Sequence, residues 1–180
     1  MSGQVDDAIL VEAAQEGDTD AFEALVRRHR NAVYRVALRM LGSPADAQDV
    51  TQETFTRAWR ALRSFRRESS VNTWLYRIVT RRCLDVIAAR TPAAEDLATL
   101  ELRARESGPA ESVERGERLR AVTVAISRLP GDQRAALVLR EFEGLSYQQL
   151  AGVLGITVPA VKGRIHRARL AVLEQMEAWE

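Results

Sequence analysis

Basic side chains near the end of the chain lie on one face of a predicted helix. Between residues 158 and 178, apolar residues recur every three or four positions and predict the buried stripe of that helix: Val158, Val161, Ile165, Ala168, Val172, Met176 and Trp179. The opposite face presents Pro159, Gly163, His166 and Arg167, and it is flanked by Lys162, Arg164 and Arg169. Hydrogen-bonding side chains with cations at both edges are typical of a helix that enters the major groove of DNA.

The residues before this helix predict a helix-turn-helix. Ser146 with Gln149 three residues later forms a capping box, and Thr157 repeats the cap for the next helix. Only residues 154–156, Leu-Gly-Ile, separate the two helices, and this motif requires a short turn that contains glycine. Solvated helix faces would explain single cations, but they do not explain the caps, the turn and the cationic face together. The sequence therefore indicates a DNA-binding unit.

A second basic cluster lies in the first half of the chain. A predicted helix over residues 71–89 has an apolar stripe formed by Val71, Trp74, Leu75, Ile78, Val79, Cys83 and Val86. Four residues are expected to point away from that stripe, namely Thr73, Arg77, Thr80 and Arg81. The loop before the helix contributes Phe65, Arg66, Arg67, Ser69 and Ser70, which suit unstacked bases and phosphates. Trp74 is interpreted as a core residue and not as a stacking platform.

The net charge of +1 conceals a strong segregation of charge along the chain. Residues 1–26 contain seven acidic residues and no basic one, and residues 27–90 contain 14 arginines against five acidic residues. Residues 91–117 have three arginines against seven acidic residues, and residues 118–180 have nine basic against six acidic residues. Two basic blocks separated by an acidic segment suggest two units that contact polyanions.

Other chemistries find little support in the sequence. Cys83 is the only cysteine, and His29 and His166 are the only histidines, which excludes an internal disulfide and Cys/His zinc sites. Cys83 falls on an apolar stripe and is interpreted as a buried thiol. No Ser/His/Asp or Cys/His set, phosphate-binding loop or metal cluster is apparent. The sequence therefore predicts no enzymatic activity, no catalytic residue, no metal and no cofactor.

The expected fold is all-α, with two small helical domains joined by a flexible linker. Gly and Pro are scarce inside the periodic segments, and alternating strand patterns are absent. Helices are predicted near residues 5–16, 19–41, 44–62, 71–89, 113–128, 131–142, 146–154 and 158–178. Composition predicts domains at 1–90 and 113–180, with a linker over 91–112. The acidic start and the lack of a long apolar stretch predict a cytoplasmic protein that does not insert in membranes.

Three stretches resemble the signature regions of a known family, in order and at the usual spacing: DAQDVTQETFTRAW (46–59), SFRRESSVNTWLYRI (64–78) and LPGDQRAALVLREFEGLSYQQLAGVLGITVPAVKGRIHRAR (129–169). In both halves the chain is similar to bacterial extracytoplasmic-function (ECF) sigma factors. The resemblance implies a first domain that binds the clamp helices of the RNA polymerase β′ subunit and captures the melted minus-10 element. It implies a second domain that binds the β flap and double-stranded minus-35 DNA. An anti-sigma factor is implied as a further partner.

The resemblance also assigns residues to each surface. Core polymerase would contact Asp46, Asp49, Gln52, Glu53, Phe55 and Trp59. Phe55 and Trp59 are i, i+4 neighbours that would equally suit a hydrophobic core. The single-stranded minus-10 element would contact Phe65, Arg66, Arg67, Ser69, Ser70, Thr73, Arg77 and Arg81. The minus-35 duplex would contact Arg140, Tyr147, Lys162, Gly163, Arg164, His166, Arg167 and Arg169.

The chain departs from the family pattern at several positions, and two rival interpretations stay open. The family often has glycine where Arg67 stands, asparagine where Arg81 stands, basic residues at positions 88 and 89, and Gly-Thr at positions 159 and 160. The promoter sequence is therefore not predicted. The main rival is a self-sufficient helix-turn-helix transcription factor, which would bind duplex DNA tightly without polymerase. An enzyme built on carboxylates such as Asp46 and Asp49 is the weaker rival.

Overall fold

The computed structural model describes residues 6–90 and 113–178, and these residues form eight α-helices, one 3-10 turn and no strand. The first group is α1 (Asp7–Gln15), α2 (Thr19–Leu41), α3 (Pro44–Ala61), the 3-10 turn η1 (Leu62–Ser64) and α4 (Val71–Ala89). The second group is α6 (Val113–Ser127), α7 (Gly131–Glu141), α8 (Tyr147–Leu154) and α9 (Val158–Glu177). The all-α prediction is confirmed, and each predicted helix matches an observed one. The predicted linker over 91–112 lies outside the described residues.

Local polar signals account for the helix boundaries. The side chain of Asp18 accepts hydrogen bonds from two backbone amides at the start of α2, and Gly42 ends α2 in the left-handed conformation with φ of 66°. Ser146 and Gln149 form the predicted capping box at the start of α8, and Gly155 ends α8, again with φ of 66°. The turn between α8 and α9 is therefore the predicted helix-turn-helix geometry.

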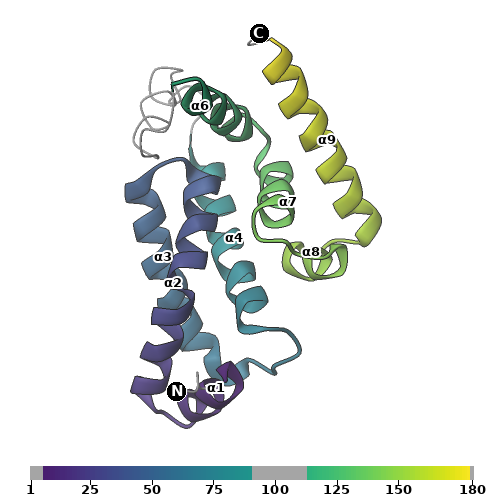
Figure 1. The fold of residues 1–180 in the computed structure, drawn as a ribbon. Helices are drawn as coiled ribbons and strands as arrows, with labels where there is room; N and C mark the ends of the chain where they lie inside the picture. The colour runs from purple at the N-terminus through teal and green to yellow at the C-terminus, as the bar shows by residue number, and fades with distance from the viewer. Residues whose placement is uncertain (1–5, 91–112, 179–180) are drawn as a thin grey trace.

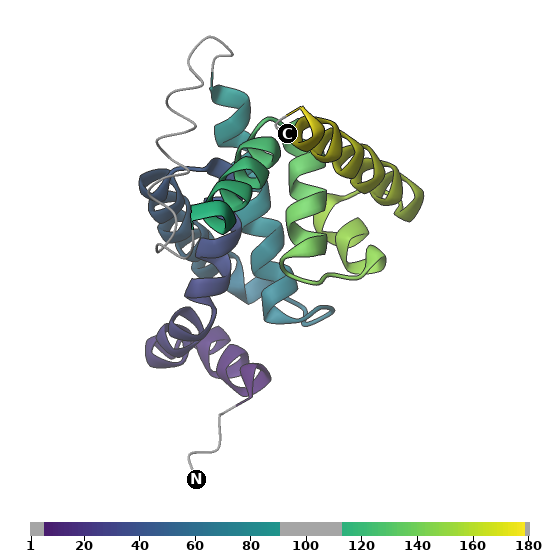
Figure 2. The ribbon, with the colours of Figure 1, turned by 45° about the horizontal axis from the view of Figure 1, so that its top comes forward.

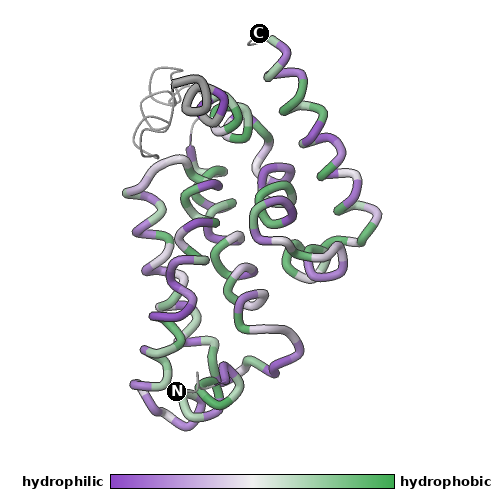
Figure 3. Tube along the Cα trace, viewed as in Figure 1, coloured by the Kyte–Doolittle hydropathy of each residue, from purple (hydrophilic) through white to green (hydrophobic). Residues whose placement is uncertain are grey.

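Helix α2 is the centre of the first group, and α1, α3 and α4 all pack against it (Figure 1). Its buried face includes Leu25, Val33 and Met40, and Cys83 on α4 is buried as predicted. Figure 3 shows hydrophobic and hydrophilic residues in turn along α2, α3 and α4, as expected for amphipathic helices around a shared core. Although α2 has 23 residues, no helix in the described ranges is apolar enough to cross a lipid bilayer.

In the second group, α9 packs against α6, α7 and α8. Val161, Ile165 and Ala168 are buried along the predicted stripe. Towards its ends the stripe is only half-buried, at Val158, Val172 and Met176, and Trp179 lies outside the described residues. The stripe is therefore most buried where α9 packs against the rest of the helix-turn-helix. This packing determines which face of α9 is exposed to solvent.

The two groups pack against one another. Helices α6 and α7 contact α2, and α7 and α8 contact α4 (Figure 2). Arg134 on α7 is 5% exposed and donates a hydrogen bond of 2.5 Å to the backbone carbonyl of Met40. A Cβ on Gly131 would lie 3.1 Å from Cδ2 of Leu84, so the lack of a side chain lets the start of α7 approach α4 closely.

This packing overturns part of the prediction for α4. The prediction that Thr73 and Thr80 point away from the core is wrong, because these residues are 7% and 1% exposed. Helices α2, α3, α7 and α8 all contact α4, so its buried surface is wider than a single apolar stripe. Arg77 and Arg81 are exposed, as predicted.

Candidate nucleic-acid interface

The outward face of α9 presents the polar residues that the sequence predicts for minus-35 DNA. Pro159, His166 and Arg167 are exposed, and Lys162 is exposed at the edge of this face. Thr157 caps the helix by accepting a hydrogen bond from a backbone amide of its first turn. The helix is thus held on its buried side and leaves Lys162, His166 and Arg167 outward, where they can approach a nucleic acid.

The two flanking arginines of α9 are paired with acidic residues on α7. Nε of Arg164 lies 3.2 Å from Oδ2 of Asp132, and Nε of Arg169 donates a hydrogen bond of 3.2 Å to Oε1 of Glu141. The hydrogen bonds from Glu141 raise the pKa of Arg169. Both pairs join α9 to α7, but the buried stripe of α9 decides its orientation, because ion pairs as exposed as these contribute little stability.

Arg140, Tyr147 and Lys162 form a cluster where α7, α8 and α9 meet. The guanidinium carbon of Arg140 lies 4.7 Å from the centroid of the Tyr147 ring, and Nζ of Lys162 lies 5.5 Å from the same centroid. Arg140 also donates a hydrogen bond of 2.7 Å to the carbonyl of Leu145. One aromatic ring therefore holds two cations beside the helix-turn-helix, which suits phosphate binding.

Gly163 leaves room for the side chain of Arg167. A Cβ at position 163 would lie 3.3 Å from Nη1 of Arg167, which is tighter than ordinary van der Waals contact. The guanidinium therefore folds over the helix turn that carries Gly163. A side chain at position 163 would therefore displace the guanidinium of Arg167.

A hollow of about 620 Å³ adjoins the loop before α4 and is called the loop hollow here. From the first group it is lined by Ser64, Phe65, Arg66, Glu68, Ser69, Ser70, Thr73, Trp74 and Arg77. Gln148, Gln149 and Gly152 of α8 line it as well. The structure thus brings most of the predicted minus-10 residues together. The three α8 residues could not be predicted from the sequence, because their position beside the loop arises from contact between the two groups.

Phe65 and Trp74 form the floor of the loop hollow. Their rings stack with centroids 4.5 Å apart and planes inclined by 23°, and Phe65 is only 9% exposed. Trp74 is half-buried, so its interpretation as a packing residue is consistent with the structure. Of this pair it is Trp74, and not Phe65, that keeps appreciable exposed surface next to the hollow.

The remaining predicted minus-10 residues differ in their surroundings. Ser70 caps α4 and its hydroxyl is hydrogen-bonded to that of Thr73 at 2.9 Å. Arg67 is exposed and has a φ of 58°, a backbone conformation that favours glycine. Arg81 is not among the residues that line the loop hollow, and it pairs with Asp85, with 3.7 Å between Nε and Oδ1. The loop hollow therefore collects all of these predicted residues except Arg67 and Arg81.

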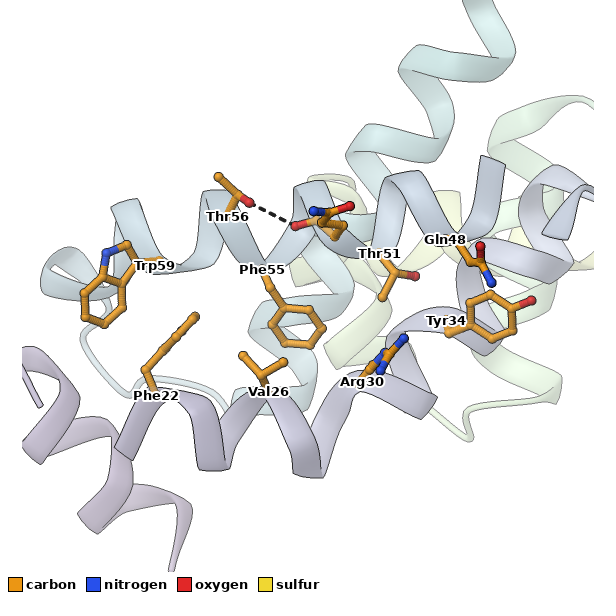
Figure 4. A pocket seen from close by; sticks show the side chains of 10 residues that line it. Phe22, Val26, Arg30, Tyr34, Gln48, Thr51, Phe55, Thr56 and Trp59 are labelled. Atoms are coloured by element: carbon orange, nitrogen blue, oxygen red, sulfur yellow. Dashed lines mark hydrogen bonds between the residues drawn. The ribbon is translucent and has the colours of Figure 1, made fainter. Parts of the chain in front are cut away.

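A second hollow, the aromatic groove, runs between α2 and α3 on the first group. It has a volume of about 680 Å³ and is lined by Phe22, Val26, Tyr34, Gln52, Phe55 and Trp59, among others. Figure 4 shows the α2 and α3 side chains facing one another across it. Phe22 and Trp59 contact with ring centroids 4.8 Å apart, and Trp59 is 39% exposed while Phe55 is 8% exposed. Phe55 is thus a core residue that forms the base of the groove.

The acidic residues predicted for core polymerase lie on α3. Asp49 and Gln52 are exposed. Oδ2 of Asp46 accepts a hydrogen bond of 2.6 Å from Arg90. Glu53 accepts hydrogen bonds from Arg82 at 2.5 Å and from Arg57 at 2.8 Å. The hydrogen bond from Arg82 is the main cause of the lowered pKa of Glu53.

Known protein families match both groups of helices. A model of Sigma-70 region 2 matches residues 25–92, and a model of Sigma-70 region 4 matches residues 119–172. The ECF RNA polymerase sigma-E factor of Escherichia coli strain K12 is 40% identical over 96% of this chain and 95% of its own length. RNA polymerase sigma-H factor of Pseudomonas aeruginosa is also 40% identical, over 96% of this chain and 94% of its own length.

Solved structures share the arrangement of the chain. CnrH, solved in complex with the cytosolic domain of CnrY, is 32% identical with a TM-score of 0.70, over 96% of this chain and 97% of CnrH. The sigma factor RpoE of Bartonella quintana, solved with the anti-sigma factor NepR, is 22% identical with a TM-score of 0.67 and supports the fold alone.

The matched sigma factors are not a family of enzymes. The chain belongs to the extracytoplasmic-function family of RNA polymerase sigma factors, which recognise promoters and initiate transcription with RNA polymerase.

Proposed function

We propose that this sigma factor reads minus-35 DNA with the outward face of α9. The observation that carries this proposal is the exposed pair His166 and Arg167 on a face whose flanks are cationic. An arginine on such a face can bond two acceptors of one guanine in the major groove, whereas cations at the edges meet phosphates. Lys162 and Arg140, held on Tyr147, would take phosphates on one side.

The loop hollow would receive an unstacked base of the melted minus-10 element. It combines the exposed cations Arg66 and Arg77 with hydroxyl groups of Ser69 and Ser70, and it has an aromatic floor at Trp74. Cations suit the strand backbone, and a shaped hollow with hydrogen-bonding groups suits a flipped base. Because α8 also lines this hollow, entry of the strand would require some displacement of the second group from α4.

Core polymerase would bind two further surfaces. The exposed polar residues Asp49 and Gln52 of α3, together with Trp59 of the aromatic groove, would meet the clamp helices of the β′ subunit. On the second group, a groove of about 360 Å³ would take the β flap. It is lined by Glu141 with its partner Arg169 and by six apolar residues, Val122, Ile126, Leu137, Phe142, Val172 and Leu173. Exposed aromatic and aliphatic side chains of this kind mark protein interaction surfaces.

An anti-sigma factor would regulate this protein in the cytoplasm. CnrH is solved with the cytosolic domain of CnrY, and the Bartonella quintana RpoE with the anti-sigma factor NepR. The similarity of the present chain to CnrH over nearly its whole length supports a protein partner for this sigma factor, since CnrH is solved with one.

The decisive experiment is reconstitution with core RNA polymerase. The purified chain should co-purify with core enzyme and direct run-off transcription from promoters selected out of genomic DNA. Tight duplex binding without polymerase, together with no initiation at any promoter, would favour a self-sufficient regulator. Asp49→Lys should lower core affinity, while Glu174→Lys, the same type of charge change at an exposed position on α9, should leave it unaltered.

Substitutions on α9 separate base reading from electrostatic attachment. Arg167→Ala should weaken binding of the cognate minus-35 duplex by about 1–3 kcal/mol and relax base preference. Arg169→Ala should weaken all sequences alike and reduce the salt dependence by about one phosphate. Competition among promoter variants in holoenzyme measures both effects. If both variants lose the same affinity on every promoter, α9 contributes only electrostatic attraction to DNA and does not recognise bases.

A further inference from the structure

Helix α1 is bonded to the beginning of the loop that precedes α4. The side-chain amide of Gln15, the last residue of α1, donates hydrogen bonds of 2.9 Å to the carbonyls of both Leu62 and Phe65. Helix α1 also packs directly against η1, the 3-10 turn that comes immediately before the loop. The side-chain amide of Gln15 therefore holds the backbone at the point where the chain enters the loop.

The same helix is bonded to the end of the loop through a buried histidine. His29 on α2 is 5% exposed, and its Nε2 lies 2.7 Å from Oδ2 of Asp7 on α1. Its Nδ1 lies 2.7 Å from Oδ1 of Asn72, the second residue of α4. Arg28 forms an ion pair with the same Asp7. The contacts between Asp7, His29 and Asn72 therefore join α1 to the first turn of α4, which follows the loop.

Between these two anchors the loop makes few contacts of its own. Residues 66–68 are exposed, and Arg67 takes the left-handed conformation with φ of 58°. The nearest acidic group to Arg67 is also on α1, with 3.8 Å between its Nη1 and Oε2 of Glu12. A segment with an unfavourable backbone conformation and exposed side chains keeps one shape only when its ends are held.

We propose that α1 is a positioning element for minus-10 recognition and that Gln15 is its principal residue. This inference rests on the proposed assignment of the loop hollow to the minus-10 element. By holding both ends of the loop, α1 presents Arg66, Ser69 and Ser70 to the hollow before DNA arrives. DNA binding then costs no free energy for ordering the loop. The apparent affinity for the melted strand is therefore higher than it would be with an unordered loop.

The test removes the two hydrogen bonds and compares the two DNA elements in one holoenzyme. Gln15→Met keeps the length of the side chain and removes its donors. It should weaken binding of a cognate minus-10 single strand by about tenfold, as expected for two hydrogen bonds. Binding of a minus-35 duplex by the same holoenzyme should change by less than about twofold. Fluorescence anisotropy with the two labelled DNAs measures both affinities.

A matched variant separates positioning from loss of stability. Val36→Ala truncates a fully buried side chain on α2 and lowers the unfolding midpoint without touching the loop bonds. It should leave the ratio of minus-10 to minus-35 affinity unaltered. Full minus-10 affinity in Gln15→Met, or an equal loss of minus-10 affinity in both variants, would overturn the proposal.

A third variant distinguishes failure of this inference from failure of the minus-10 assignment. Arg77→Ala removes an exposed cation of the loop hollow itself. Loss of minus-10 affinity in Arg77→Ala with full affinity in Gln15→Met would reject the role of α1 and leave the hollow as the minus-10 site. Unaltered affinity in both variants would reject the assignment and the inference together.

Discussion

The phenolic hydroxyl of Tyr76 on α4 donates a hydrogen bond of 2.8 Å to Glu143, which follows α7. The side chain of Glu143 is only 4% exposed, and two arginines of α2 complete its surroundings. Arg35 lies 3.5 Å and Arg39 lies 3.4 Å from its carboxylate oxygens. Burial lowers the pKa of Arg39, and the charge of Glu143 opposes that shift. A single carboxylate of the second group therefore joins both α2 and α4 of the first.

Removing the Tyr76 hydroxyl should weaken this junction. Tyr76→Phe deletes a hydrogen bond to a buried carboxylate that keeps its two arginines, so the free energy of unfolding should fall by about 1–2 kcal/mol. Tyr34→Phe, in the aromatic groove, is the matched control and should change it by less than about 0.5 kcal/mol. Urea denaturation of the two variants measures the difference. If the two variants are equally stable, the Tyr76 hydrogen bond makes no net contribution to the free energy of unfolding.

The same contact predicts a loss of stability at high pH. Burial, followed by the hydrogen bond to Glu143, raises the pKa of Tyr76 in the folded chain. The unfolded phenol ionises near pH 10, so the contribution of Tyr76 is complete below that pH. It declines as the pH rises above about 10, because the unfolded state then releases a proton that the folded state retains. Unfolding curves between pH 8 and about 11 should show a steeper decline for the wild type than for Tyr76→Phe, whereas parallel declines would contradict the assignment.

Glycine at position 67 should stabilise the first group of helices. Arg67 has a φ of 58°, which disfavours any residue with a side chain. Arg67→Gly should therefore raise the free energy of unfolding by about 0.5–1 kcal/mol, measured by thermal or urea denaturation. Arg66→Gly removes the same charge at an adjacent exposed position and should lower it, because glycine adds conformational entropy to the unfolded chain. A loss of stability in Arg67→Gly would mean that the loop backbone is not strained there.

Cys83 should be unreactive in the folded protein. Its thiol is buried on α4, and burial raises the pKa of Cys83 to about 12. The thiolate is the reactive form, so a thiol reagent at pH 8 should label less than about 0.1 thiol per chain. In concentrated urea the same reagent should label one thiol per chain, because Cys83 is the only cysteine. Rapid labelling under native conditions would show that α4 opens readily.

Alanine at position 163 should separate helix stability from DNA reading. Gly163→Ala should raise stability by up to about 1 kcal/mol through helix propensity, yet its Cβ would displace the guanidinium of Arg167. Minus-35 base preference in holoenzyme should therefore weaken. Gly152→Ala on α8 is the control, since its Cβ would lie 3.8 Å from Nη2 of Arg77, an ordinary contact distance. If both variants keep full minus-35 preference, the position of Arg167 over Gly163 is irrelevant to recognition.

Helix boundaries and the helix-turn-helix could be predicted from the sequence because their signals are local. Asp18, Ser70, Ser146 and Thr157 each cap a helix through an amide two or three residues away. The apolar stripe of α9 and the burial of Cys83 follow from periodicity within one helix. The grouping of basic and aromatic residues beside the loop was visible for the same reason, since the loop and the start of α4 are adjacent in sequence.

Contacts between distant residues were decided only by the tertiary structure. Gln15 reaches Phe65 across 50 positions, and Tyr76 reaches Glu143 across 67. Thr73 and Thr80 are buried because α4 is packed between helices of both groups, whereas a single helical stripe predicts only one buried face. The sequence by itself determined the helices, their caps and the outward face of α9. The packing of the helices decided which polar side chains are buried and which helix holds the loop before α4. Local sequence patterns cannot predict contacts between residues so far apart in the chain.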